Sequence, residues 1–272
     1  MRPITVLVHG ALGKMGKEVV RAVSHDHELR IIGAVDKLAT ENQLPLSYTS
    51  ATVPLSSDLD SLLRICNPDV LVDFTIAESS IMAARIASKQ KVNLVIGTTG
   101  LSEDDLSEID QLSRANSIGA VVAPNFALGA VVLLHLAKVA AKFFNYAEII
   151  ELHHQEKADA PSGTALATAR AMREARDKPF EYPITRKENL SGSRGGQVDG
   201  ITIHSVRLPG IMASQEVILG GPGQTLSLRH DTINRECYMM GVILAIKEVV
   251  KREGLVYGLD ALLGLGGTNE AI

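Results

Sequence analysis

The residues with the clearest capacity for chemistry lie in one short run, residues 151–165, which reads ELHHQEKADAPSGTA. His153, His154 and Lys157 stand close together within it. Histidine titrates near neutral pH and can pass on a proton, and lysine brings a mobile positive charge. The run therefore predicts a site that holds a small anion and supplies it with a proton.

The elements around this run predict that it lies at a helix end. Residues 147–154 have the pattern of a strand. Pro161 predicts the start of a helix, because proline lacks the N–H that the first turn leaves unpaired. The free backbone N–H groups around Ser162, Gly163 and Thr164 would then point outward from the positive end of that helix. Such an end binds carboxylates and phosphates.

Two alternatives compete with this interpretation. A single histidine or lysine at a strand end is in most cases solvated or held by local hydrogen bonds. Histidine is also the commonest metal ligand. Adjacent residues of a strand point to opposite faces, however, so His153 and His154 are poorly placed to share one ion, and no cysteine lies near. We therefore expect no metal at this run.

A second candidate site opens the chain. The apolar residues 4–8 predict a strand, and the residues after Gly16 have the spacing of a helix. Between these elements lies a turn with Gly10, Gly13 and Gly16. Leu12 occupies the position of the middle glycine in the strict dinucleotide fingerprint. The order of strand, turn and helix predicts a dinucleotide-binding loop, although an ordinary turn between a strand and a helix has the same pattern.

The residues that follow support a dinucleotide-binding fold. Residues 29–35 predict a second strand, and Asp36 comes where a ribose-binding carboxylate belongs. After a polar stretch, strands are predicted at 70–74, 92–96 and 119–123, alternating with helices at 58–66, at 77–90 and after a capping Ser102. This alternation predicts a parallel sheet covered on both faces, with ligands at the carboxyl ends of its strands. The residues at those ends are Gly10–Gly16, Asp36, Thr75, Gly97–Thr99 and Pro124–Asn125.

Composition narrows the class of protein. The 272 residues suffice for two domains, and the net charge of −4 without a lysine or arginine block argues against a nucleic-acid partner. The most apolar later segment, 127–144, contains a histidine and two lysines, which favours a buried helix over a membrane span. The first strand is too short for a signal peptide. Cys66 and Cys237 show no pairing pattern, as expected in a reducing cytosol.

The second part of the chain has a different character. Its predicted elements are helices over 128–144, 161–176 and 233–251, a long loop over 178–200, and strands at 201–208, 214–219 and 224–230. Glycine-rich turns join the three strands, which predicts an antiparallel sheet. The last helix is apolar along one face and is expected to pack on the first domain.

At this point the run from Glu151 to Ala165 resembles the signature of the 4-hydroxy-tetrahydrodipicolinate reductase family, also called dihydrodipicolinate reductases, of diaminopimelate and lysine biosynthesis. The resemblance covers essentially the whole chain, including the glycine loop, Val72–Thr75, Gly97–Gly100, Ala123–Phe126 and Val206-Arg207. It implies an α/β protein with a Rossmann-like doubly wound parallel sheet and a smaller α+β substrate domain with an open mixed sheet. It also implies reduction of a cyclic dicarboxylate with NADH or NADPH by a cytoplasmic homotetramer.

The resemblance implies a place and a role for each part. Residues 1–126, completed by 236–272, would bind the dinucleotide, and residues 127–235 would bind substrate and form the tetramer. His153 matches the proton donor, and Lys157 matches a further proton-transfer residue. The positions that match substrate contacts are His154, Ser162, Gly163, Thr164 and Arg235. The positions that match cofactor contacts are Gly10, Ala11, Leu12, Gly13, Lys14, Met15, Asp36, Lys37, Gly97, Thr98, Thr99, Ala123, Pro124, Asn125 and Phe126.

Two places depart from the family pattern. Ala213 and Gln215 stand where many relatives have glycine and histidine, so we expect a turn there to pack differently. Asp36 followed by Lys37 replaces the acid–arginine pair of some relatives. Asp36 suits the ribose hydroxyls of NADH, whereas Lys37 and Lys14 suit the 2′-phosphate of NADPH. We therefore expect both cofactors to be used.

Two other functions stay open on the sequence alone. One is another two-domain NAD(P)-dependent amino-acid dehydrogenase, acting on aspartate semialdehyde or diaminopimelate. The semialdehyde reaction needs a nucleophilic cysteine, and neither Cys66 nor Cys237 lies in a catalytic context. The other is a non-catalytic nucleotide-sensing module, which would need the glycine loop but not His153 and Lys157.

Overall fold

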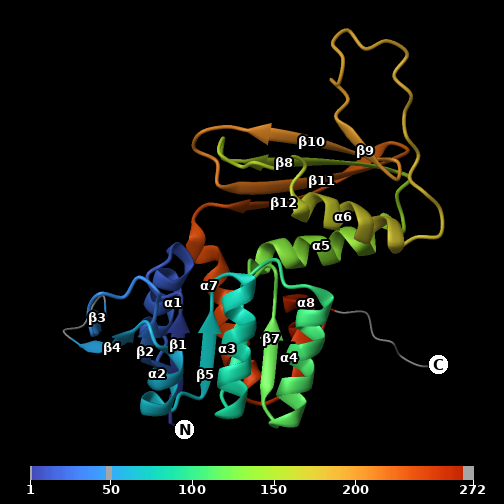
Figure 1. Cartoon of the computed structure of the whole chain (residues 1–272). Coiled ribbons are helices and arrows are strands. Elements are labelled where there is room, and N and C mark those ends of the chain that lie inside the picture. Colours follow the sequence, from blue (N-terminus) through green and yellow to red (C-terminus); the bar gives the residue numbers. More distant parts are fainter. Residues whose placement is uncertain (1, 47–50, 266–272) are drawn as a thin grey trace, which may run out of the picture. The chain divides into compact units, whose positions relative to one another are not determined.

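The computed structural model describes residues 2–46 and 51–265 (Figure 1). The chain divides into two compact units, Met1–Leu128 with Tyr238–Ile272 and Gly129–Cys237. The first unit is therefore assembled from two separate stretches of chain, whereas the second is continuous. None of the helices within the described residues is long and apolar enough to cross a lipid bilayer.

The first unit contains an eight-stranded sheet in the order β13-β7-β6-β5-β1-β2-β4-β3. Its strands are β1 (Ile4–His9), β2 (Leu29–Val35), β3 (Gln43–Pro45), β4 (Thr52–Ser56), β5 (Val70–Asp73), β6 (Asn93–Ile96), β7 (Gly119–Val122) and β13 (Gly254–Tyr257). Neighbouring strands are parallel, apart from the antiparallel pair of β3 and β4. The strand order reverses between β1 and β5. That reversal is the topological switch point, beside which open α/β sheets bind their ligands.

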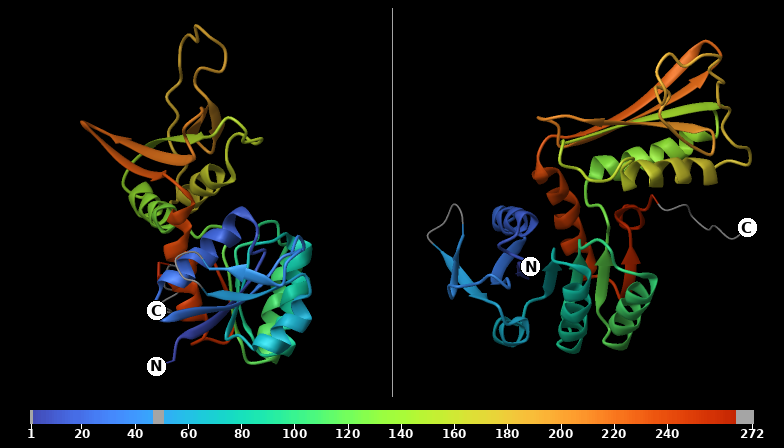
Figure 2. Two further views of the ribbon diagram at one scale, coloured as in Figure 1. Left: turned by 90° about the vertical axis from the view of Figure 1, so that its left-hand side faces the viewer. Right: turned by 45° about the horizontal axis from the view of Figure 1, so that its top comes forward.

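Helices cover both faces of this sheet (Figure 2). They are α1 (Lys14–His25), α2 (Leu59–Cys66), α3 (Ala77–Lys89), α4 (Glu103–Ala115), α7 (Met239–Val249) and α8 (Leu259–Leu262). Helices α2, α3 and α4 lie next to one another on one face, and α1 lies beside α7 on the other. Helix α7 packs on β5, β6 and β7, which confirms that the last long helix belongs to the first unit.

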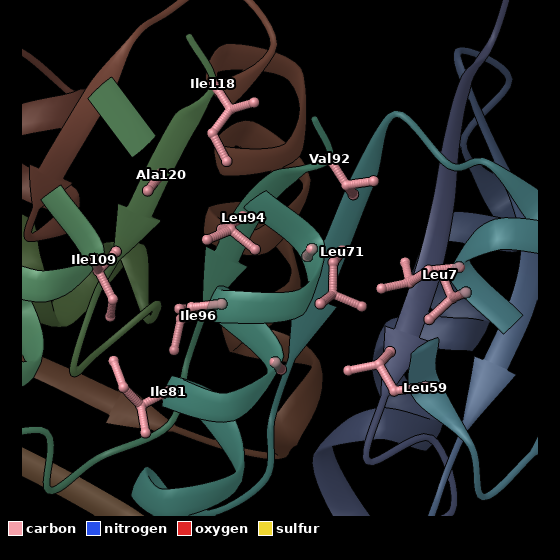
Figure 3. Close-up of a cluster of buried hydrophobic side chains, with 14 of the residues drawn as sticks. Leu7, Leu59, Leu71, Ile81, Val92, Leu94, Ile96, Ile109, Ile118 and Ala120 are labelled. Atoms are coloured by element: carbon pink, nitrogen blue, oxygen red, sulfur yellow. The ribbon is translucent and has the colours of Figure 1, made fainter. Parts of the chain in front are cut away.

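Aliphatic side chains fill the space between the sheet and α2, α3 and α4 (Figure 3). Leu7, Leu71, Leu94 and Ala120 come from four adjacent strands and are at most 1% exposed. Truncating a buried leucine of this kind costs about 2–5 kcal/mol. This core fixes the strands whose carboxyl ends carry the first candidate site.

The second unit contains a five-stranded mixed sheet in the order β12-β11-β8-β10-β9. Its strands are β8 (Tyr146–His153), β9 (Gly196–Val198), β10 (Ile201–Arg207), β11 (Ala213–Gly221) and β12 (Gln224–Thr232). Helices α5 (Leu128–Ala141) and α6 (Gly163–Glu174) share one hydrophobic core with one face of the sheet. No helix of this unit covers the other face in the described part of the chain (Figure 1). The short 3-10 helix η1 (Arg235–Tyr238) follows β12.

Several predicted elements need correction. The predicted antiparallel sheet holds for β11 and β12, but β10 and β11 are not neighbours, because β8 lies between them and is parallel to β10. The polar stretch 37–58 contains β3 and β4, and the loop predicted over 178–200 contains β9. The last predicted helix is shorter than 233–251, and β13 and α8 follow it. The missed strands are short and partly polar, so their sequences carry little periodic signal.

Candidate functional site

The glycine loop after β1 is packed too closely for side chains at two positions. Gly10 has φ +80°, a conformation that favours glycine, and its N–H donates to the Val35 carbonyl at 2.8 Å. A Cβ at Gly16 would lie 2.0 Å from the Gly10 carbonyl oxygen. Gly16 therefore lets α1 begin directly against the loop.

The N-terminus of α1 is open, as a phosphate site requires. Its N-cap residue, Gly13, has no side chain to accept a hydrogen bond, and the first turn contains no acidic residue. Helix α4 is different, because Ser102 and Asp105 form a complete capping box there. The first-turn N–H groups of α1 thus fit the pyrophosphate of a dinucleotide.

Asp36 follows β2 and holds the glycine loop in place. Its carboxylate is buried and accepts hydrogen bonds from the Leu12 N–H at 2.9 Å and the Leu38 N–H at 3.0 Å. Each carboxylate oxygen keeps a further lone pair for a ribose hydroxyl. Lys37 and Lys14 are exposed and can approach a phosphate from solvent.

A buried aspartate that the sequence analysis gave no role organises the switch point. Asp73 ends β5, lies opposite His9 at the end of β1, and is 1% exposed. Its oxygens accept hydrogen bonds from His9 Nδ1 (2.7 Å), Thr75 N (3.0 Å), Thr75 Oγ1 (2.8 Å), Ser80 Oγ (2.8 Å) and Thr98 Oγ1 (2.9 Å). Burial opposes its ionisation, but the hydrogen bonds and charge of His9 and the Ser80 and Thr75 bonds outweigh it and lower the pKa of Asp73. An acidic residue inside an otherwise apolar strand is the signal that could have revealed this role.

The remaining predicted cofactor residues follow β6 and β7. Gly97 lies against the ring of Phe74, since a Cβ at this position would be 2.1 Å from that ring. The rings of Phe74 and Phe126 lie 5.8 Å apart. Asn125 uses its Oδ1 to accept the Ala127 N–H at 2.8 Å. The predicted positions with exposed side chains here are Thr99 and Pro124, whereas Thr98 and Ala123 are buried.

In the second unit the apolar core gives way to polar residues at one end of the sheet. Three successive cross-strand rows from β11, β8 and β10 read Val217–Ile149–Ile203, Gln215–Glu151–Ser205 and Ala213–His153–Arg207. Every second residue of a strand points to the same face, so these rows share the face that packs on α6. The sheet that forms the core of the second unit therefore also positions the polar side chains at its end.

Glu151 is the centre of this polar end. It is fully buried, and its Oε2 lies 2.5 Å from His153 Nδ1. Arg207 binds it in a bidentate manner, through Nη1 at 3.0 Å and Nη2 at 2.8 Å, and the Ser162 N–H donates to it at 3.3 Å. Burial opposes ionisation, but hydrogen bonds from Arg207, Ser205 and His153 lower the pKa of Glu151 below its ordinary value. The sequence analysis missed the roles of Glu151 and Arg207, although charges at core-facing strand positions call for a partner.

His153 has little solvent around it. Burial is the largest influence on its pKa and lowers it, and the charges of Lys157 and Arg207 act in the same direction. The hydrogen bond and charge of Glu151 raise the pKa but do not restore the ordinary value. The side chain that sequence analysis selected as proton donor thus lies between opposing charges.

The start of α6 differs from the prediction. The helix begins at Gly163, with Ser162 as N-cap, whose Oγ accepts the Ala165 N–H at 3.2 Å. Pro161 therefore precedes the helix. The Ser162 N–H is not free, because it donates to Glu151. The N–H groups of Gly163 and Thr164 have no acceptor among the described residues and stay available to an anion.

The other predicted substrate residues lie in different settings. The backbone carbonyl of the exposed His154 accepts the Lys157 N–H at 3.2 Å, and Lys157 Nζ binds the Asp159 carboxylate at 2.6 Å. Asp159, which the sequence analysis did not select, is thus the partner of Lys157 in this structure. Arg235 lies in η1 and, within residues 2–46 and 51–265, makes no hydrogen bond or ion pair with this cluster.

The two departures from the family pattern lie in a strand and not in the expected turn. Ala213 and Gln215 both belong to β11. Gln215 is buried and its Nε2 donates to Thr168 Oγ1 of α6 at 2.9 Å, whereas its Oε1 has no partner. Gln215 therefore ties the sheet to α6 beside Glu151.

Comparison with known proteins gives a consistent result over the whole chain. Residues 4–126 match the family model of the dihydrodipicolinate reductase N-terminus, and residues 129–263 match that of its C-terminus. The chain is 56% identical to the 4-hydroxy-tetrahydrodipicolinate reductase of Dehalococcoides mccartyi strain 195, over 97% of this chain and 100% of that protein. It is 46% identical to the enzyme of that name from Moorella thermoacetica, over 96% and 98%. The dipicolinate-bound dihydrodipicolinate reductase of Paenisporosarcina sp. TG-14 superposes with a TM-score of 0.86 at 40% identity, covering 95% of this chain and 99% of that one.

Proposed function

Because the chain belongs to the dihydrodipicolinate reductase family and reduces 4-hydroxy-tetrahydrodipicolinate with a nicotinamide cofactor, we propose that His153 is the proton donor of this reaction. The observation that carries the proposal is the partly buried pairing of His153 with Glu151, next to the free N–H groups of Gly163 and Thr164 at the start of α6. A bound nicotinamide supplies the hydride. Hydride addition to a conjugated imine ring leaves negative charge that must be protonated, and a histidine suits that step.

The substrate is a small dicarboxylate, and we assign its binding to the residues that follow β8. The free N–H groups of Gly163 and Thr164 suit one carboxylate. Lys157 adds a charge-assisted hydrogen bond once the substrate displaces Asp159. His154 and Ser162 flank this site, and Arg235 adds positive charge from η1.

We assign the cofactor to the first unit and the substrate to the second. The open N-terminus of α1 would hold the pyrophosphate, and the residues after β6 and β7 would hold the nicotinamide and its ribose. Asp36 favours the ribose of NADH, whereas Lys37 and Lys14 favour the phosphate of NADPH. With one acid against two lysines, kcat/KM for the two cofactors should differ by less than about tenfold, or ~1.4 kcal/mol.

We further propose that the enzyme is a cytoplasmic homotetramer assembled through the second unit. The support is the face of its sheet that no helix of the unit covers within the described residues. An uncovered sheet face of this kind is a ready contact surface for another copy.

The test measures the reduction of enzymatically generated substrate with NADH and with NADPH, in the parent protein and in His153→Ala. We expect kcat to fall by about 10²–10⁴-fold, the usual contribution of a positioned general acid. The KM for the cofactor should change little. His27→Ala is the control, because it removes an exposed histidine from the turn between α1 and β2. Near-parent turnover in His153→Ala would exclude His153 as the proton donor.

A further inference from the structure

Glu151 lies between Arg207, whose guanidinium binds it through two hydrogen bonds, and the imidazole of His153. We propose that Glu151 and Arg207 are positioning residues of the reduction: Glu151 fixes the orientation and tautomer of His153, and Arg207 offsets the charge of Glu151. This inference rests on the proposed role of His153. It predicts that the two residues tune the acidity of His153 in opposite directions.

The geometry determines which nitrogen of His153 gives up the proton. An ionised carboxylate only accepts hydrogen bonds, so Nδ1 of His153 carries a hydrogen directed at Glu151 Oε2. The proton that leaves is therefore the one on Nε2. The Nε2–H bond breaks, its electron pair stays on Nε2, and a C–H bond forms on the reduced ring. The neutral imidazole that remains keeps its Nδ1–H and is ready to take the next proton at Nε2.

Arg207 does more than neutralise a buried acid. Its Nη2 also donates to the Asp159 carbonyl at 2.7 Å, which connects Glu151 to the loop that carries Lys157. Its Nη1 donates to the Val206 carbonyl at 2.7 Å. A guanidinium fork satisfies a carboxylate and a carbonyl in one plane, whereas lysine offers a single point charge. Arg207 thus fixes Glu151 and the adjoining loop together.

The charged groups that face His153 from each packed element are few. Glu151 comes from β8 and Arg207 from β10. The loop contributes Lys157, with Asp159 bound to it. The neighbouring residues of β11, Ala213 and Gln215, are uncharged, and so is the first turn of α6. Glu151 is therefore the acid in direct contact with His153, and Arg207 is the cation in direct contact with that acid.

A bidentate arginine–carboxylate pair in the first unit provides a control. Arg85 of α3 binds Glu108 of α4 through Nε at 2.5 Å and Nη2 at 2.8 Å. This pair contains no histidine and has no contact with Glu151 or Arg207. Substitutions in it report the general cost of losing such an ion pair.

The experiment measures kcat/KM against pH in Glu151→Gln and Arg207→Gln. The parent activity should decline as pH rises and His153 loses its proton. Removing the acid in Glu151→Gln should shift this decline by about one pH unit or more to lower pH, because a nearby opposite charge stabilises the charged form. Removing the cation in Arg207→Gln should shift the decline in kcat/KM to higher pH. Arg207→Lys should move the decline part of the way back toward the pH of the parent protein. Glu108→Gln and Arg85→Gln should leave the pH of the decline unchanged.

Shifts in the same direction, or none in either variant, overturn the proposal. If His153→Ala keeps its turnover, the proposed function of His153 fails. If His153→Ala is inactive while Glu151→Gln keeps the parent pH profile, only the positioning role fails. If the Glu151 and Arg207 variants do not fold, a measurement on the unaltered protein still tests the proposal. The ¹⁵N spectrum of labelled histidines, assigned by comparison with His153→Ala, should show the Nδ1–H tautomer of neutral His153, and the Nε2–H tautomer would contradict the proposal.

Discussion

Two of the histidine–carboxylate pairs within the described residues lie at the ends of strands, and they differ in their surroundings. Asp73 binds His9 but also several hydroxyl and backbone donors, so its charge is spread over a rigid network. Glu151 also accepts the Ser162 N–H, but its ionisable partners are His153 and one arginine, so a change at either of these reaches the other directly. The first pair fixes a loop, whereas the second can tune an acid.

Substitution of a second single residue, Lys157, tests the proposed substrate site. In Lys157→Ala the KM for the substrate should rise by about tenfold or more, because a hydrogen bond to a charged group contributes about 1.5–3 kcal/mol. Removing the competitor in Asp159→Ala should lower KM or leave it unchanged, since Arg207 binds the Asp159 carbonyl and not its side chain. Steady-state kinetics on both variants measures these changes in the KM for the substrate. A lower KM in Lys157→Ala, or unchanged values in both, would place the substrate elsewhere.

At the scale of elements, the glycine loop shows how tightly a helix start can be built. In Gly16→Ala the added Cβ would meet the Gly10 carbonyl at 2.0 Å, which backbone atoms cannot accommodate without moving. We expect a loss of about 1–3 kcal/mol of unfolding free energy, as for other overpacked sites, and a clear rise in KM for the cofactor.

Gly13→Ala is the matched control for this prediction. Gly13 has an ordinary φ of −68°, and a Cβ there would lie 3.2 Å from the same carbonyl. Its effect on both quantities should be smaller. Thermal unfolding and cofactor kinetics measure the difference, and equal effects at the two positions would show that the contact at Gly16 relaxes easily.

The parallel strands were predictable because each is a short apolar run followed by a helix pattern. The capping role of Ser102 was predictable from adjacent residues, and the structure confirms it. The pairing of β8 with β10 was not, because it joins residues far apart in sequence. For the same reason the sequence pointed to His153 but not to its partners: Arg207 reaches Glu151 only through the register of those strands. Local signals thus find candidate side chains, whereas non-local pairing decides what they bind.

At the scale of the whole molecule, we expect buried carboxylates to contribute to the loss of stability in acid. Asp73 in the first unit and Glu151 in the second both have lowered pKa values in the folded protein. A lowered pKa contributes stability above the ordinary value of about 4, and this stability is lost as pH falls through the folded pKa. We therefore expect both units to lose stability as pH falls below about 4.

Calorimetry between neutral and acidic pH tests this expectation. Asp73→Asn should lower Tm at neutral pH and show a smaller further loss on acidification than the parent protein. Asp104→Asn, an exposed position in the first turn of α4, is the control and should keep the parent pH dependence. An unchanged acid response in Asp73→Asn would mean that other carboxylates control the transition.

The discontinuity of the first unit also has a consequence for how the protein is made. Strand β13, which pairs with the edge of β7, and helix α7, which packs on β5, β6 and β7, both come after the whole of the second unit in the chain. During translation, the unit that leaves the ribosome first is therefore the last to be completed. Until then it presents an unpaired strand edge and an uncovered apolar face, the features that invite aggregation. A ribosome that stalls within residues 129–237 holds a nascent chain that lacks α7 and β13, although all the residues after β1, β2, β6 and β7 that we assign to the cofactor have already been made.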